Sequence, residues 1–338
     1  MVVIAVMGLA LLAAAVGATL ANDSSSPDTS ARKDSTASAA ERSRGCARPY
    51  SDASPWNTPI GGSPRVAPDS GRHISALEGA LTSDPTQYTY PVYEVSRRTQ
   101  RQSVRVRNVY SDVTAGGRRL TVRKGPTIRL PIPAGARAAE GSDAQIILLD
   151  RDTGDEWGAW RLSREGGRWG MENGYHYNTR WSGVPPRAAD GQTFGSRGAG
   201  VPYLAGLVRP CELRRGRIDH ALAFAYNFPS PAHVYPATKS DGSGDRTADM
   251  PEGTRMQLDP SLTAQRLGEM GCRGPCLTIA RALQRYGMYV IDNSGRPKVI
   301  LEYVDTARWR GFVDAETVSP IPLSAFRVLR PCRPGSRC

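Results

Sequence analysis

Alternating apolar and polar positions predict that most of this chain is β-strand. The stretch 88–130 contains four such runs, YTYPVYEVS, SVRVRNVYS, RLTVRKG and TIRLPIP. Valine and arginine alternate in SVRVR, so one face of that strand is expected to be exposed. Residues 143–163 have the pattern of a hairpin, with an apolar strand, an Asp-Thr-Gly-Asp turn and a second strand. Further strands are expected at 217–226, 232–236, 254–258, 288–291 and 299–304.

One segment has helical spacing instead. In GPCLTIARALQRYG, Pro275 suits a first turn, Gly287 suits a stop, and apolar side chains recur at Ile279, Ala280 and Leu283. We therefore expect a helix near 276–286. Many short strands with one or two helices predict a mainly β domain of the β-sandwich or jelly-roll type.

The first 45 residues differ from the rest in composition. Residues 1–21 are apolar or small and carry no charge, which is typical of a signal peptide ending at Ala21 or of a retained N-terminal anchor. Residues 22–45 are rich in Ser and Ala, contain no aromatic residue and are expected to form a disordered tether. Residues 46–338 are expected to form a single β-rich domain. Either interpretation of the first segment places that domain outside the cytoplasm, secreted or at the cell surface.

An even number of cysteines in an exported chain predicts disulfide bonds. The six are Cys46, Cys211, Cys272, Cys276, Cys332 and Cys338. The motif CRGPC can close a small ring between Cys272 and Cys276. The other pairings stay open, with one choice joining the two tail cysteines and leaving the remaining two to each other. The cysteine spacing does not suit zinc, so no metal site is expected from it.

The chain has a formal net charge of +12. A basic exported domain suits acidic surroundings such as uronic or teichoic polymers, although solubility and a preference for arginine over lysine explain the same charge. No basic stretch has the pattern of a nucleic-acid-binding module, so no specific nucleic-acid partner is expected. The expected partner is a polysaccharide, an acidic one in one version. A monomer is expected, touching a membrane only through an N-terminal anchor.

Aromatic residues gather in the stretch 157–181. Aromatic rings can bind the flat faces of sugars, and ligand clefts combine them with a few polar groups. The alternative is that they fill the core. MENGYHYNTRWSG is too rich in Asn, Gly and Arg to be all core, so a loop or edge segment with some exposed rings is expected. The candidate ligand-binding residues are Trp157, Trp160, Trp181, Tyr175 and His176.

Four acidic residues lie close together just before this aromatic stretch. Asp150, Asp152, Asp155 and Glu156 partly resemble a calcium-binding loop, but the glycine and the distal glutamate are not in register. A simple turn is the preferred interpretation. Calcium stays open as a ligand, and no other cofactor is expected.

A histidine lies within the apolar segment GRIDHALAFAY. On a strand, His220 shares a face with Ile218, Leu222 and Phe224, whereas Asp219 points the other way, so no adjacent Asp–His pair forms. His220 is therefore either a hydrogen-bonded core residue or part of the wall of a ligand cleft. We predict the cleft, with Tyr177 and Arg180 nearby.

Several motifs together resemble a family of exported single-domain proteins from actinobacteria and relatives. They are PIPAGARAAEGSDAQIILLDRDTGDEW, GVPYLAGLVRP, GRIDHALAFAY, VYPATKSDG, MPEGTRMQLDP and IARALQRYGMYVIDNSG, and they cover about 125–305. The resemblance implies an exported single domain and no particular reaction.

The function expected from the sequence is carbohydrate binding or cleavage on a cell-wall or environmental polysaccharide. A glycoside hydrolase needs two carboxylates, for which Asp143, Glu172, Asp292 and Glu302 are candidates. A lyase acting on uronic acids would use His220 or Tyr177 as the base and Arg180 to neutralise the substrate. The catalytic candidates are thus His220, Tyr177, Arg180 and Asp292. A non-catalytic polysaccharide binder or a structural surface protein is the alternative, so catalysis itself stays open.

Overall fold

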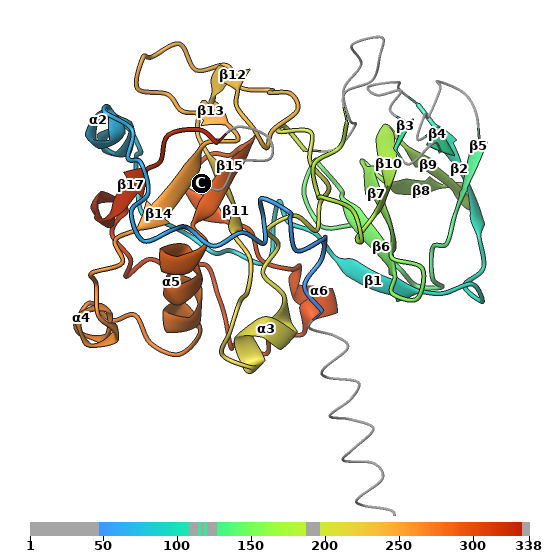
Figure 1. The fold of residues 1–338 in the computed structure, drawn as a ribbon. Coiled ribbons are helices and arrows are strands. Elements are labelled where there is room, and N and C mark those ends of the chain that lie inside the picture. The colour runs from blue at the N-terminus through green and yellow to red at the C-terminus, as the bar shows by residue number, and fades with distance from the viewer. Residues whose placement is uncertain (1–46, 108–113, 116–117, 120–126, 187–196, 333–338) are drawn as a thin grey trace, which may run out of the picture. The chain divides into compact units, whose positions relative to one another are not determined.

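β-Strands make up most of the regular structure, as the alternating pattern predicts. The computed structural model describes residues 47–107, 114–115, 118–119, 127–186 and 197–332. Within these ranges the strands form one five-stranded, two four-stranded and two two-stranded sheets (Figure 1). The mainly β class is therefore confirmed.

The five-stranded sheet has the order β16-β11-β15-β14-β17. β11 runs parallel to β15, and the other neighbours are antiparallel. Its strands are β11 (Leu222–Tyr226), β14 (Arg255–Leu258), β15 (Met288–Asn293), β16 (Lys298–Val299) and β17 (Phe326–Val328).

Two four-stranded sheets come from residues 92–178, in the orders β1-β6-β7-β10 and β5-β2-β9-β8. Each contains one parallel pair, β1 with β6 and β2 with β9, unlike the antiparallel strands of a jelly roll. The strands of the first sheet are β1 (Val92–Val95), β6 (Ile146–Asp150), β7 (Asp155–Trp160) and β10 (Asn173–Asn178). Those of the second are β2 (Gln102–Val106), β5 (Thr127–Leu130), β8 (Ser163–Glu165) and β9 (Arg168–Met171).

The remaining elements are short. Two pairs of strands stand apart: β3 (Thr114–Ala115) with β4 (Arg118–Arg119), and β12 (Ser230–His233) with β13 (Pro251–Glu252). The helices are α2 (Ser70–Ser75), α3 (Pro210–Arg214), α4 (Ala264–Glu269), α5 (Pro275–Arg285), α6 (Val304–Ala307) and the 3-10 helix η1 (Leu323–Ala325).

Strict alternation along the central strands divides the interior into separate apolar cores. On β11, Leu222 and Phe224 belong to a core that the helices also line, whereas Ala223 belongs to a second core. On β6, Ile147 faces that second core and Ile146 faces a third. The second core therefore contains residues of both the five-stranded sheet and the β1-β6-β7-β10 sheet.

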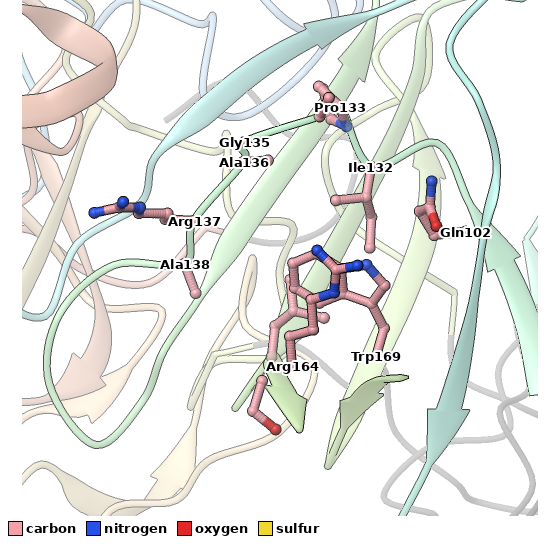
Figure 2. Close-up of a pocket in the computed structure, with 12 residues that line it drawn as sticks. Gln102, Ile132, Pro133, Gly135, Ala136, Arg137, Ala138, Arg164 and Trp169 are labelled. Atoms are coloured by element: carbon pink, nitrogen blue, oxygen red, sulfur yellow. The ribbon is translucent and has the colours of Figure 1, made fainter. Parts of the chain in front are cut away.

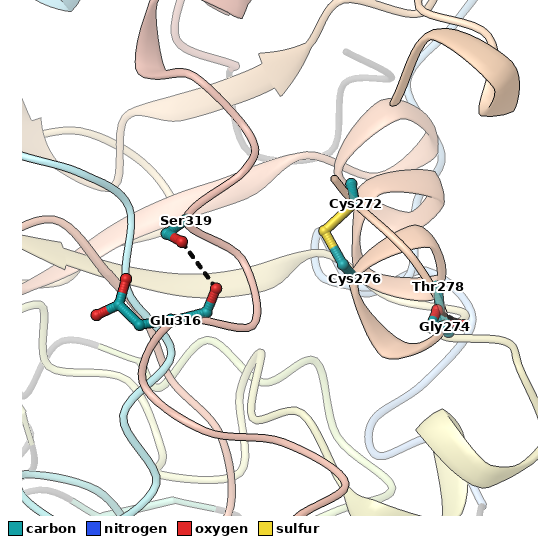
Figure 3. The surroundings of a disulfide bond; sticks show 6 residues. All are labelled: Cys272, Gly274, Cys276, Thr278, Glu316 and Ser319. Carbon is teal, nitrogen blue, oxygen red and sulfur yellow. Dashed lines mark hydrogen bonds between the residues drawn. A yellow bond between two sulfur atoms is a disulfide. The ribbon is translucent and has the colours of Figure 1, made fainter. Parts of the chain in front are cut away.

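The expected helix is α5, and its boundaries follow the predicted signals. Pro275 begins it, and the backbone of Gly287 turns left-handed (φ 69°) just after it. The predicted disulfide between Cys272 and Cys276 is present at its start (Figure 3). Cys211 and Cys332 are also disulfide-bonded. The other two cysteines, and with them the suggested pairings, lie outside the described residues.

The predicted hairpin is β6 and β7, which pair antiparallel around a tight turn. Asp150 closes that turn, because its Oδ1 accepts the backbone N–H groups of Asp152 and Thr153 at 3.0 and 3.1 Å. Asp155 instead bonds His176, and Glu156 is buried. These acids thus serve different partners and do not converge on one calcium site.

The described residues lie in the larger of two compact units, Gly45–Cys338. The predicted signal segment and tether lie outside the described residues. Within the described part of the chain, no helix combines the length and the apolar character that a membrane span requires.

Candidate functional site

His220 does not line a cleft, contrary to our prediction. It precedes β11 on the expected face but is only 1% exposed. Its Nε2 lies 2.9 Å from Oε1 of Glu212, and its Nδ1 lies 2.9 Å from the carbonyl oxygen of Ala221. Both partners are acceptors, so the ring carries both protons. Burial opposes that charge, but Glu212 outweighs it and raises the pKa of His220. His220 is therefore the core residue of the two alternatives.

Tyr177 and Arg180 do not meet His220 in a cleft either. Tyr177 is 1% exposed and packs edge-on against Trp181, with the ring centroids 5.0 Å apart. Arg180 is exposed, and its guanidinium donates to the backbone oxygen of Asp152 at 2.7 Å. Tyr177 belongs to the buried edge strand β10. Burying its large ring in the core stabilises the fold more than exposing the ring to solvent would.

The predicted aromatic platform is largely covered by other side chains. Trp157 stacks on His176 with a centroid distance of 5.0 Å, and the Arg101 guanidinium lies 5.3 Å from the Trp157 ring. Tyr175 is buried and donates to Glu156 at 2.5 Å. Trp160 lies under the Arg161 guanidinium, at 4.7 Å, and Trp181 is half-buried. MENGYHYNTRWSG contains the edge strand β10, as expected, but its rings mainly pack against other side chains.

Asp292 is the predicted catalytic residue that lines a cavity. This cavity of about 460 Å³ lies where the parallel strands β11 and β15 end at their carboxyl sides. Residues from the segments before β1 and β6 also line it. Its lining includes Tyr88, Tyr90, Asp143, Gln145, Asn227, Asp241, Asp292, Asn293 and Lys298. Asp143, a candidate second carboxylate, is fixed there by a 3.1 Å bond from the Trp160 indole N–H.

A β-bulge aims Asp292 at this cavity. Met288 and Val290 face the helix-lined core, and simple alternation would send Asp292 the same way. The register instead shifts, so that Phe224 pairs with Val290 but Ala225 pairs with Asp292. The extra residue turns the carboxylate to the side of Ala225, as bulges beside functional sites commonly do.

Two further carboxyl groups lie beside Asp292. Oxygens of Asp241, Glu252 and Asp292 all fall within 4.8 Å of one another, and we call these three residues the carboxyl cluster. Glu252 is fully buried, and no N–H or O–H donor among the described residues reaches either of its oxygens. A Cβ added at Gly198 would collide with oxygens of Glu252 and Asp241, so the absence of a side chain there lets the two approach.

Burial and mutual repulsion favour protons on this cluster. Burial, then Asp292 and Asp241, raise the pKa of Glu252 to about 9, so Glu252 is neutral at pH 7 and can donate to Asp241. Burial and the Asp241 carboxylate raise the pKa of Asp292 to about 7, against the opposing charge of Arg197. A carboxyl group with such a pKa can both give and take a proton near neutrality.

Oxygens at this spacing could also surround a divalent cation such as Ca²⁺, which takes oxygen ligands at 2.3–2.6 Å. Arg197 and Lys239 already place positive charge near the cluster, because both lower the pKa of Asp292. We therefore interpret the cluster as sharing protons.

Tyr88 provides an exposed aromatic ring at the same cavity. It is 51% exposed and holds a left-handed backbone conformation (φ 47°), which is rare for a residue other than glycine. The Lys298 ammonium donates to the backbone oxygens of Gln87 and Tyr88 and so supports this conformation. Burial lowers the pKa of Lys298 to about 8.

Sequence reasoning found Asp143 and Asp292 but missed Asp241, Glu252 and Tyr88. Glu252 lies in the turn-like motif MPEGT, and Asp241 lies in the polar stretch KSDGSGD, where acids are usually solvated. The other two candidate carboxylates form ion pairs elsewhere, Glu172 with Arg107 at 2.9 Å and Glu302 with Arg209 at 2.6 Å.

A separate cavity of about 550 Å³, away from the carboxyl cluster, contains other aromatic and basic groups (Figure 2). Trp169 lies in it, with the Arg164 guanidinium 5.6 Å from its ring. The titratable residues that line it are Arg137 and Arg164. Without a carboxylate in its lining it lacks a proton donor for acid–base chemistry, so the carboxyl-lined cavity is the better candidate site. Comparison with family models, with curated proteins and with solved structures finds no match for this chain.

Proposed function

We propose that this protein is an exported glycoside hydrolase that cleaves a polysaccharide in the carboxyl-lined cavity. The observation that carries the proposal is the pair Asp292 and Asp241 in one open cavity, with oxygens within 4.8 Å and with the pKa of Asp292 raised to about 7. Retaining glycoside hydrolases place two carboxyl groups about 5 Å apart. The disulfides suit an oxidising compartment, which supports export.

The residues suggest a division of labour. In the first step the Asp292 carboxylic acid protonates the glycosidic oxygen, while the Asp241 carboxylate attacks the anomeric carbon. The C–O bond to the leaving sugar breaks, and that sugar departs as an alcohol. In the second step the Asp292 carboxylate takes a proton from water, which attacks the same carbon and releases Asp241. Neutral Glu252 holds Asp241 in place by donating a hydrogen bond.

Hydrolysis is favoured over the uronate lyase because of the charge at the site. Three carboxyl groups line the cavity, Asp143, Asp241 and Asp292. They would repel a uronic acid unit. The residues expected to serve a lyase, His220, Tyr177 and Arg180, lie elsewhere.

A product assay tests the proposal. Purified protein is incubated with a panel of polysaccharides, and reducing ends are measured together with absorbance at 235 nm. We expect reducing ends without the absorbance of an unsaturated lyase product. Asp292→Asn should lower the rate about 10²-fold or more, as expected for loss of a general acid. Asp305→Asn, an exposed carboxylate on α6, is the matched control and should leave the rate unchanged.

Two outcomes would contradict the proposal. Absorbance at 235 nm in step with the reducing ends would identify a lyase. Tight binding of a polysaccharide with no product from any member of the panel would favour the non-catalytic alternative.

A further inference from the structure

The geometry points to a groove with two subsites that takes a linear glycan of neutral or amino sugars, with Phe228 as the ring that binds the distant sugar. This inference rests on the proposed function and deepens it. A second cavity of about 380 Å³ adjoins the catalytic one, because Asn227, directly after β11, lines both. Both volumes lie in the usual range for ligand sites, about 300–1,000 Å³.

Each cavity has one exposed aromatic ring. Tyr88 lines the first and is 51% exposed; Phe228 lines the second and is 49% exposed. Only two other large hydrophobic side chains are exposed in the part of the chain that the structure describes, Val66 at 38% and Phe312 at 42%. Exposed rings add little to folding, whereas they can stack on the faces of sugars.

Both rings are held in unusual backbone conformations. Phe228 has φ 58° and Tyr88 has φ 47°, in the left-handed region that disfavours large side chains. The side-chain oxygen of Asn293 accepts the Phe228 N–H at 3.2 Å, and Asn293 itself lines the catalytic cavity. Backbone strain of this kind clusters at ligand sites. The two subsites are therefore connected by a direct contact as well as by the shared Asn227.

The charge of the groove selects the class of sugar. The second cavity adds its own carboxyl groups, and the Arg246 guanidinium there is already paired with Asp249 at 2.9 Å. The carboxyl residues lining the two cavities are Asp143, Asp241 and Asp292 in the first and Glu78, Asp245 and Asp249 in the second. Such a lining repels uronates and phosphates and accepts neutral or protonated amino sugars, although the whole chain is basic.

A chain-length series tests the inference. The probes are β-1,4-linked glucosamine and glucose oligomers and α-1,4-linked galacturonic acid oligomers, each of two to six units. We expect glucosamine or glucose hexamers to be cleaved, and Phe228→Ala to lower kcat/KM for the hexamer about tenfold, as expected for the loss of one stacked ring. The dimer, which cannot reach the second subsite, should be unaffected. Phe312→Ala removes another exposed phenylalanine ring, one that lines neither cavity, and should change nothing.

Binding measurements keep this test separate from that of the proposed function. Calorimetry with Asp292→Asn protein measures hexamer affinity without turnover. If wild-type protein cleaves nothing but Phe228→Ala still weakens hexamer binding, hydrolysis fails and the groove stands. If hexamers are cleaved and Phe228→Ala matches wild type at every length, the groove is overturned. Tighter binding of galacturonic acid oligomers than of the other two would overturn the assignment of sugar class, and binding of no oligomer would overturn both proposals.

Discussion

Replacing Glu252 with glutamine tests whether the carboxyl cluster holds protons or a cation. Glutamine has nearly the same shape as a protonated glutamic acid, and its amide can donate to Asp241 as the acid does. It cannot ionise, however. The substitution therefore keeps the contact and removes the titration.

The size of the effect follows from the pKa of Glu252, raised from 4.5 in the unfolded chain to about 9 in the fold. Between these values the unfolded chain has released its proton and the folded chain has kept it. Stability therefore falls as pH rises, by about 1.4 kcal/mol for each pH unit. At pH 7 the accumulated cost is about 3 kcal/mol, and glutamine relieves it.

Thermal unfolding between pH 5 and pH 8, with and without Ca²⁺ or EDTA, measures this effect. We expect Glu252→Gln to raise Tm by roughly 6 °C at pH 7, at about 2 °C per kcal/mol for a domain of this size, and by less at pH 5. Glu316→Gln, at an exposed position, is the control. The reasoning is refuted if Glu252→Gln lowers Tm at pH 7 while Ca²⁺ raises the Tm of wild type, because the cluster would then hold a cation that needs all three charges.

Three further predictions concern other parts of the structure. Gly198→Ala should lower hydrolysis at least about tenfold with an unchanged circular dichroism spectrum, because its methyl group pushes the carboxyl cluster apart; an unchanged rate would contradict this. His220→Ala should cost about 3 kcal/mol in urea unfolding, since it leaves Glu212 buried without its cation, while hexamer binding persists. Because the pKa of His220 is raised, this stabilisation is complete below pH 6.5 and is lost as pH rises through the folded value; a loss on acidification instead would refute the pairing. Replacing Cys272 and Cys276 by alanine should cost about 2 kcal/mol, the entropy of a very short loop, and no loss of stability would contradict that estimate.

Local patterns were enough to predict much of the fold. Pro275, Gly287 and the apolar spacing between them define α5 without help from distant residues. The period-two pattern around Leu222 and Phe224 also sorted side chains correctly between two cores. The same pattern placed His220 on the right face but could not tell a core from a cleft wall. That difference depends on Glu212, which comes from a separate helix.

The candidate site was harder to predict because it is assembled from distant segments. Asp241, Glu252 and Asp292 are each unremarkable in their own motif, and only the fold brings them together. The exposure of the aromatic stretch was predicted wrongly for a related reason. Asn and Gly around Tyr175 indicate a loop, but the ring is buried because its hydroxyl reaches the buried carboxylate of Glu156.

The bulge in β15 gives the candidate site an unusual sensitivity to chain length. Inserting one residue between Met288 and Asp292, with the bulge kept, would shift Asp292 by one position and turn its carboxylate toward the helix-lined apolar core, where an unpaired charge is costly. The exposed turn at Gly295 and Arg296 follows Asp292, so a residue added at Arg296 leaves the register of Asp292 unchanged, although Gly295 itself lines the cavity. During divergence or engineering, insertions should therefore be tolerated after β15 and selected against within it. A distant relative that kept this chemistry would be recognised by the spacing along that strand rather than by overall identity.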